Sequence, residues 1–151
     1  MTLKKWANFA TIFGTVLAAI LAIIGINTYI ENMRWNSYRY LADVYNDILK
    51  TELNNPDFKN PEITQNYDCT WSSSSTMFFK YDTYALICWS YLEDIYYAKQ
   101  FREDFLTIYA PLFKMYKDLH GKWFESNKKL FMPDFVEFID KEEYIKFIRA
   151  V

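Results

Sequence analysis

The amino-acid sequence predicts an all-α protein, in which an N-terminal transmembrane helix continues into a stalk and is followed by a small C-terminal helical bundle. Three observations predict this fold class. An uncharged apolar run of 22 residues lies near the N-terminus. Apolar residues then recur at helical spacing, with no alternating strand pattern and no internal repeat. Residues that break helices are scarce, because the 151 residues include only three Gly and four Pro.

The uncharged run extends from Phe9 to Ile30. A helix of this length spans roughly 33 Å, which is enough for the hydrocarbon core of a bilayer. Trp6, Tyr29 and Trp35 lie where an aromatic belt is expected. A cleaved signal peptide is the alternative, but its apolar region is usually about 7–15 residues long and ends at a small-residue cleavage site. We therefore expect residues 1–31 to form a retained single-pass anchor in an inner or plasma membrane.

The orientation of this anchor is poorly specified. Lys4 and Lys5 favour an inward N-terminus, whereas Arg34, Arg39 and Lys50 favour the opposite orientation. The positive-inside count is therefore nearly a tie.

Cysteine content gives a weak indication of the compartment. Cys69 and Cys88 are too few to form a disulfide framework, although one bridge between them is possible. Cys88 lies in an apolar helical run, where a free Cys behaves as a small hydrophobic residue. Reduced thiols favour a cytoplasmic helical domain.

Small residues recur along one face of the anchor at spacings of 4, 3, 4, 4 and 3. Such a seam lets two helix backbones approach closely, which is the usual basis of helix association in lipid. The alternative is that these residues are simply common in transmembrane helices. The seam predicts a homo-oligomer. Its members are Ala7, Thr11, Gly14, Ala18, Ala22 and Gly25.

The stalk and the segment after it are expected at residues 32–52 and 53–75. No helix breaker separates the anchor from the stalk, and Asn54-Asn55-Pro56 ends the helix. Residues 53–75 contain two Pro and a run of four Ser, so we expect a long loop that acts as a lid or a tether. The stalk presents a helical stripe that consists of Tyr38, Leu41, Tyr45, Ile48 and Glu52, widened by Val44 and Leu49.

The remaining residues, 76–151, are expected to form a helical bundle that packs with the stalk as one domain. The first helix, 76–99, is apolar nearly all round, which indicates burial. The next runs from residue 101 to 123, and Pro111 is expected to bend or restart it. A last amphipathic helix opens at Pro133 and continues to residue 148.

Charge and composition exclude several function classes. All 19 acidic residues and 15 of the 17 basic residues lie at or beyond Glu31, so that part carries a net charge of about −4. This balance is not typical of a duplex nucleic-acid binder. His120 is the only histidine, and the adjacent acidic pairs at 93–94 and 103–104 are expected to be solvated helix ends. With no Gly-rich phosphate loop either, we expect no enzyme, no metal site and no cofactor.

One basic stretch, residues 114–129, is the candidate ligand site. Cations beside aromatic planes suit a small anionic ligand, such as a nucleotide or an acidic lipid headgroup. The alternative is the solvated face of an amphipathic helix. The candidate ligand-binding residues are Lys114, Lys117, His120, Lys122, Trp123, Lys128 and Lys129.

Two segments, YDTYALICWSYLEDIY (81–96) and LHGKWFESNKKLFMPDFVEFI (119–139), resemble an uncharacterised family of small bacterial single-pass membrane proteins. That family has a helical domain with a Trp-x-x-Leu-Glu helix, a His-Gly-x-Trp-Phe turn and a Pro-x-Phe segment. The resemblance extends from about Tyr38 onward and implies the fold and the anchoring, but no activity. It points to Trp89, Glu93, His120 and Trp123, for which the alternative is a helix-packing junction.

Two function classes remain from the sequence. The first is a non-enzymatic membrane-anchored sensor or effector that binds a partner or an anionic ligand and assembles through its membrane helix. Its layout is similar to small effectors of antiviral defence that respond to a cyclic oligonucleotide. The second is a structural accessory subunit of a larger membrane complex.

Overall fold

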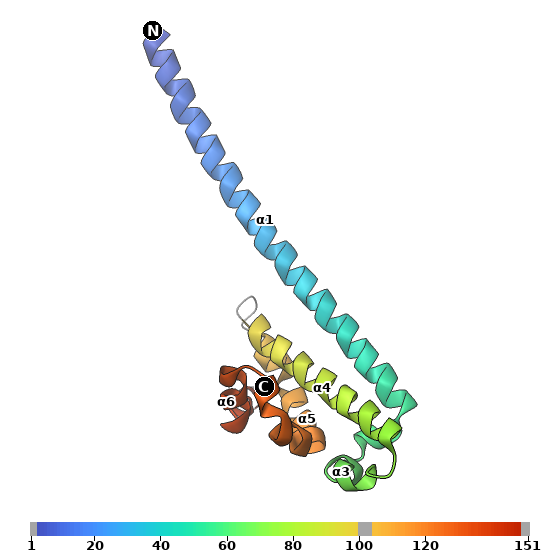
Figure 1. The fold of residues 1–151 in the computed structure, drawn as a ribbon. Coiled ribbons are helices and arrows are strands. Elements are labelled where there is room, and N and C mark those ends of the chain that lie inside the picture. Colours follow the sequence, from blue (N-terminus) through green and yellow to red (C-terminus); the bar gives the residue numbers. More distant parts are fainter. Residues whose placement is uncertain (1–2, 100–103, 149–151) are drawn as a thin grey trace. The chain divides into compact units, whose positions relative to one another are not determined.

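The computed structural model describes residues 3–99 and 104–148, except for the side chains of residues 3–5, 7–10 and 75. All regular elements of the described residues are helices, and none of them is a strand (Figure 1). The predicted all-α class is confirmed. The chain divides into two compact units, Met1–Tyr38 and Arg39–Val151.

The first unit contains the N-terminal part of helix α1, which extends over Leu3–Asn54. Every described side chain from residue 11 to 30 is exposed, and most are large and apolar. The hydroxyls of Thr15 and Thr28 donate to the carbonyls of Thr11 and Ile24, each at 2.9 Å. The polar atoms of these threonines are therefore satisfied inside the helix, as a lipid environment requires. Within the described residues this one helix is long and apolar enough to cross a membrane, with a mean hydropathy of 2.0 over an 18-residue window.

The second unit begins inside α1, which continues to Asn54 without interruption. Leu41, Ile48 and Glu52 face its interior and are buried. They are separated by seven and four residues, so they lie on one helical face. The predicted stalk stripe is therefore a packed surface from Leu41 to Glu52, whereas its first member, Tyr38, is exposed.

Residues 53–75 differ from the expected long loop, because they contain three short helices. Their bounds are η1 Pro56–Lys59, α2 Pro61–Thr64 and α3 Tyr67–Thr70. Proline opens the first two at the position where its missing N–H costs nothing. The Asn60 side chain caps α2 by accepting from the Glu62 amide at 3.0 Å. Segments this short show no helical period, and the burial of Phe58, Tyr67 and Trp71 holds them on the bundle.

Helix α4, Ser75–Ala98, is the central element of the bundle, as the sequence predicted. The Ser74 side chain caps it by accepting from the Met77 amide at 3.4 Å. Burial along α4 extends over most of its length and circumference. The buried residues are Tyr81, Tyr84, Ala85, Cys88, Trp89, Tyr91, Leu92, Ile95, Tyr96 and Ala98.

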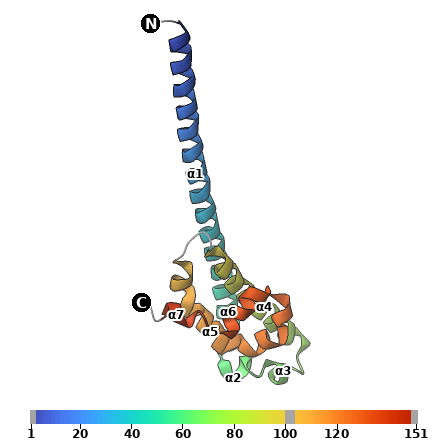
Figure 2. The same cartoon turned by 90° about the vertical axis from the view of Figure 1, so that its left-hand side faces the viewer.

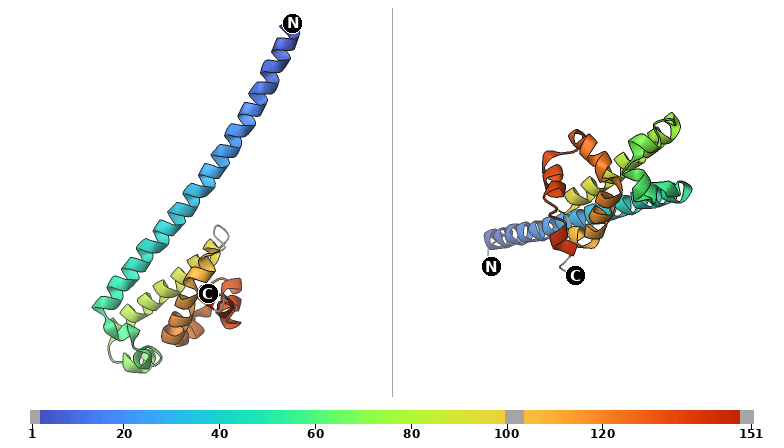
Figure 3. Two further views of the ribbon diagram at one scale, coloured as in Figure 1. Left: turned by 180° about the vertical axis from the view of Figure 1, so that it is seen from behind. Right: turned by 90° about the horizontal axis from the view of Figure 1, so that it is seen from below.

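Helix α5, Phe105–Asn127, packs along α4 (Figures 1 and 3). It passes through Pro111 without interruption, so the helix does not restart there. The non-helical residue is His120, with φ −124° and ψ 15°. This position departs from helical geometry because contacts from α4 hold both the ring and the carbonyl of His120, as described below.

After α5 the chain forms three short helices, and the last two replace the single helix expected from residue 133 to 148. Their bounds are η2 Lys128–Leu130, α6 Pro133–Asp140 and α7 Ile145–Ile148, and α7 packs against α5 (Figure 2). Glu142 separates α6 from α7 with a positive φ of 51°. A left-handed residue ends a helix, and its amide here donates to the Ile139 carbonyl at 3.1 Å.

Candidate functional site

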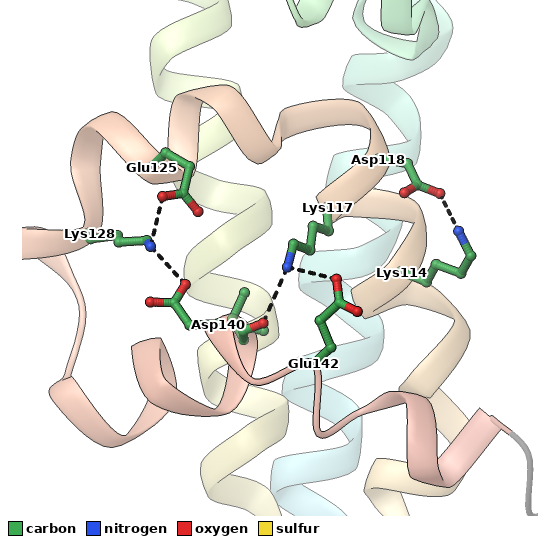
Figure 4. Close-up of polar contacts among 8 residues, drawn as sticks. Lys114, Lys117, Asp118, Glu125, Lys128, Asp140 and Glu142 are labelled. Atoms are coloured by element: carbon green, nitrogen blue, oxygen red, sulfur yellow. Dashed lines mark hydrogen bonds and ion pairs between the residues drawn. The ribbon is translucent and has the colours of Figure 1, made fainter.

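The basic stretch 114–129 does not form one cationic surface, because four of its lysines are paired with carboxylates. Figure 4 shows the pairs that involve Lys114, Lys117 and Lys128. Lys114 Nζ lies 2.7 Å from Asp118 Oδ2, one turn further along α5. Such an exposed pair contributes about 0.3–0.5 kcal/mol.

Lys117 and Lys128 connect α5 and η2 to the C-terminal segment. Lys117 Nζ lies 3.1 Å from Glu142 Oε1 and donates to the Ile139 carbonyl at 3.4 Å. Lys128 Nζ lies 2.7 Å from both Glu125 and Asp140. These lysines therefore hold the turn between α6 and α7 against α5.

Lys122 connects α5 to the short helix α3. Its Nζ lies 2.7 Å from Asp68 Oδ1. The hydrogen bond from Lys122 lowers the pKa of the Asp68 carboxyl, and the same bond raises the pKa of Lys122. Both groups are charged at neutral pH, so the pair stabilises the placement of α3.

The other candidate residues have different environments. His120 and Trp123 are buried, and the Trp123 indole N–H donates to Asp82 Oδ1 at 2.7 Å. Lys129 is exposed and has no ion-pair partner among the described residues. The structure thus brings the seven candidates onto neighbouring turns, but it does not direct them into one pocket.

His120 lies in a buried polar centre between α4, α5 and α2. Its Nδ1 lies 3.0 Å from the Tyr81 hydroxyl, which also lies 3.4 Å from the Thr64 carbonyl. The His120 carbonyl accepts from the Trp89 indole N–H at 3.3 Å. Burial lowers the pKa of His120 to about 3, so the ring is neutral at physiological pH.

A second part of this polar centre is Glu52, whose side chain is 4% exposed. The Tyr84 hydroxyl donates to Glu52 Oε1 at 2.7 Å, and Lys59 Nζ lies 2.7 Å from Oε2. Both carboxylate oxygens therefore have partners, which a buried charge requires. This contact connects the end of α1 to α4 and η1.

The Cys88 thiol lies in the same interior, near the hydroxyls of Tyr84 and Tyr116. Burial raises its pKa to about 12, so the thiol is protonated at neutral pH. The Tyr116 hydroxyl and His120 Nε2 are buried and make no hydrogen bond within the described part of the chain. These groups therefore form a closed interior in which the thiol is protonated and the imidazole is neutral.

Sequence reasoning missed three members of this centre: Glu52, Tyr81 and Tyr84. Glu52 had a detectable signal, because a carboxylate on the apolar stripe of a helix must find partners when the stripe is buried. The two tyrosines had none, since a Tyr in an apolar run fits the core equally well without a specific partner.

The four positions singled out by the family resemblance have structural contacts. Trp89 and Trp123 fill the core. Glu93 Oε1 accepts from the Met132 amide at 2.8 Å and thereby caps the start of α6. Burial raises the pKa of this carboxyl, so Glu93 is not the freely solvated helix end that was expected. The contacts of these positions are those of a helix-packing junction.

Among the described residues, no group of three or more His, Cys, Asp or Glu side chains lies close enough together to hold a metal ion. Comparison with protein-family models, curated proteins and solved structures found no match. The contacts described above are therefore the basis for any assignment of function.

Proposed function

We propose that this chain is a single-pass membrane protein whose helical domain acts as a non-enzymatic binding module. One observation carries the proposal: the apolar side chains of α1 between residues 11 and 30 are exposed along the whole segment. Each exposed apolar Å² costs about 25 cal/mol in water, so this surface needs an apolar solvent. A bilayer supplies that solvent over the length of the segment.

The interior of the second unit supports a binding role more than a catalytic one. His120 is fully buried, and Cys88 is buried with a raised pKa. Neither side chain has the access to solvent or substrate that a general base or nucleophile needs. The polar centre instead supports a rigid domain with an external binding surface.

Two versions of this function remain under the proposal. In the first, the domain is a sensor or effector that binds an anionic ligand at residues 114–129, in antiviral defence with a cyclic oligonucleotide as the signal. Two lysines support this version. Lys129 is exposed and has no ion-pair partner among the described residues, and Lys114 is held only by an exposed pair with Asp118 that an anionic ligand can replace. In the second, the chain is an accessory subunit of a larger membrane complex. The ion pairs of Lys117, Lys122 and Lys128 support this alternative, because carboxylates of the chain already occupy the positions that an anionic ligand needs.

Salt dependence separates the two versions. A cyclic oligonucleotide or acidic lipid held by exposed lysines binds more weakly as the salt concentration rises, because exposed charges are screened over about 8–10 Å. An accessory subunit binds neither ligand at any salt concentration and remains monomeric when it is purified alone.

Membrane anchoring is tested by alkaline carbonate extraction of cell membranes. Wild-type protein should stay in the membrane pellet. A variant with Ile20→Arg and Ile24→Arg should be released, because each Arg near the helix centre costs about 2.5–3.5 kcal/mol. The matched control, Asn32→Arg with Asn36→Arg, has the same spacing beyond the apolar run and should stay in the pellet. Release of the wild type, or retention of the Ile20 and Ile24 variant, would contradict the proposal.

A further inference from the structure

A groove in the second unit is lined by the last turns of α1, by η1 and by the first half of α4. Its larger part has a volume of about 670 Å³, within the usual range of small-molecule sites. A smaller part of about 220 Å³ shares Thr51, Tyr84 and Ile87 with it, so the two parts are continuous. All of these residues belong to the second unit.

The chemistry of the lining changes along the groove. Asn55, Thr76 and Lys80 line only the larger part, together with the aromatic rings of Phe58 and Phe79. Val44 and Ile48 line only the smaller part. Because Lys80 and Ile87 are seven residues apart on α4, the cationic end lies about 10 Å from the aliphatic end. The groove therefore has a polar, cationic end and an apolar end.

The charged residues around the groove increase the difference between its two ends. Lys80 is the one charged residue that lines the larger part, and it has no ion-pair partner among the described residues. The nearby Lys50 and Lys59, in contrast, are paired with Asp47 and Glu52. The groove is thus locally positive on a chain whose net charge is −2.

The aliphatic end carries no unpaired charge. Asp47 lines the smaller part and is paired with Lys50 at 2.8 Å. The pair has no net charge, so this end does not attract an anionic group. A ligand with one anionic head therefore has a single favourable direction, with its head at Lys80 and its apolar body toward Val44 and Ile87.

We propose that this groove binds a single-chain anionic amphiphile, namely the carboxylate of a medium-chain fatty acid. The carboxylate lies at Lys80 and accepts from the hydroxyls of Thr76 and Thr83. The alkyl chain covers the exposed side chains of Phe79 and Ile87 and the partly buried Val44, and so removes apolar surface from water. This inference rests on the proposed binding function and specifies its ligand and its site, which differ from the basic stretch 114–129.

The test uses the full chain in lipid nanodiscs and a photoreactive decanoate that carries a diazirine near the end of its alkyl chain. Cross-linked peptides are mapped by mass spectrometry. Labelling should concentrate on residues 44–58 and 76–87, and unlabelled decanoate should suppress it. Labelling of the anchor peptides reports decanoate dissolved in the lipid, so the ratio of groove to anchor labelling is the measured quantity.

Three variants make this test specific. Lys80→Met should weaken competition by decanoate about fivefold, the factor that corresponds to an exposed charge pair of about 1 kcal/mol. Thr83→Trp adds a bulky ring at an exposed groove position and should abolish groove labelling without altering the core. Lys129→Met, the matched control, removes an exposed lysine outside the groove and should leave the ratio unchanged.

Two outcomes would overturn the inference: a labelling ratio that is unchanged in both Lys80→Met and Thr83→Trp, or competition by adenosine monophosphate or neutral decanol as strong as that by decanoate. Carbonate extraction is read out independently. If decanoate does not bind in the groove but the protein stays in the membrane pellet, only the proposed ligand is refuted. If the wild type is released from membranes, the proposed function is refuted.

Discussion

His120 is the one residue inside α5 whose backbone departs from helical geometry. Its ring contacts Tyr81, its carbonyl accepts from Trp89, and its backbone leaves helical geometry between these two contacts. The sequence predicted a bend or a restart at Pro111, yet the helix does not restart there and its non-helical residue is His120. Tertiary hydrogen bonds therefore outweigh local propensity at this site.

The burial of His120 predicts a specific dependence of stability on pH. Its pKa falls from 6.5 in the unfolded chain to about 3 in the folded chain, because burial disfavours the charged ring. Between these values the unfolded state binds a proton that the folded state does not. The free energy of unfolding should therefore decrease by about 1.4 kcal/mol for each pH unit as the pH falls through this window, and this effect should be absent above about pH 7.

The comparison variant for this measurement is His120→Asn, which offers the Tyr81 hydroxyl a neutral partner and does not titrate. Thermal unfolding of both proteins in the same detergent, followed by near-ultraviolet circular dichroism, gives the two pH profiles. The carboxylates are common to both proteins, so the difference between the profiles isolates His120. Parallel profiles from pH 7 to pH 4 would show that the ring is not buried as a neutral group.

At the scale of elements, the short helices of the second unit differ from the long ones in what stabilises them. The long helices α4 and α5 follow apolar stripes that are visible in the sequence. The short helices α3, α6 and α7 have four to eight residues each, and an isolated helix of that length is unstable in water. Buried aromatic residues hold α3 and α6 on the bundle, and α3 also has an ion pair with α5. Helix α7 packs against α5, and its partly buried Phe147 contacts the core.

The anchor segment of α1 carries the small-residue seam, and self-association through this seam stays a prediction. The side chain of Ala7 lies outside the described residues, whereas the other five members are exposed. A Cβ added at Gly14 or Gly25 meets no atom within 4 Å. A larger residue there is therefore compatible with the isolated chain.

Substitution at the seam should consequently reduce the oligomer without unfolding the monomer. Gly14→Ile or Ala18→Ile places a branched side chain where two backbones meet, and the oligomer should dissociate in detergent and in lipid. Val16→Phe adds bulk on the opposite face of the helix and should leave the oligomer unchanged. Size-exclusion chromatography with light scattering measures the mass of each complex. A wild-type mass in both seam variants would rule out this interface.

At the scale of the whole molecule, one unit exposes a long apolar segment and the other has its own aromatic core. The apolar segment of the first unit has no buried side chain in its described part. The second unit buries large aromatic residues such as Trp89, Phe113 and Trp123. If α1 spans a membrane as proposed, the boundary between membrane and water is expected in α1 near residue 31, where the uncharged run ends.

The side of the membrane on which the helical domain lies is tested with its own cysteines. Cys69 is exposed, whereas Cys88 is buried with a pKa raised to about 12. If the domain is cytoplasmic, a membrane-impermeant maleimide should label the protein only after the cells are opened. Cys69→Ser should abolish this labelling, and Cys88→Ser should not. Labelling in intact cells would place the domain on the outer side.

Local patterns in the sequence were sufficient for the fold class, the apolar anchor segment and the two long helices of the bundle. Each depends on residues within a few turns of one another, and hydrophobic periodicity reports such residues directly. A helix period also indicated which face of α1 is buried, through Leu41 and Ile48.

Tertiary structure determined which charged and polar groups pair across long sequence separations. Lys122 pairs with Asp68 across 54 residues, and Tyr84 bonds Glu52 across 32. No sequence period specifies such pairs, because they depend on how separate helices meet. The same long-range packing divides residues 53–75 and 133–148 into short helices, and it pairs Lys117, Lys122 and Lys128 with distant carboxylates. The groove beside Lys80 arises in the same way, since one wall comes from α1 and η1 and the other from α4, with α2 and α3 between them in the sequence.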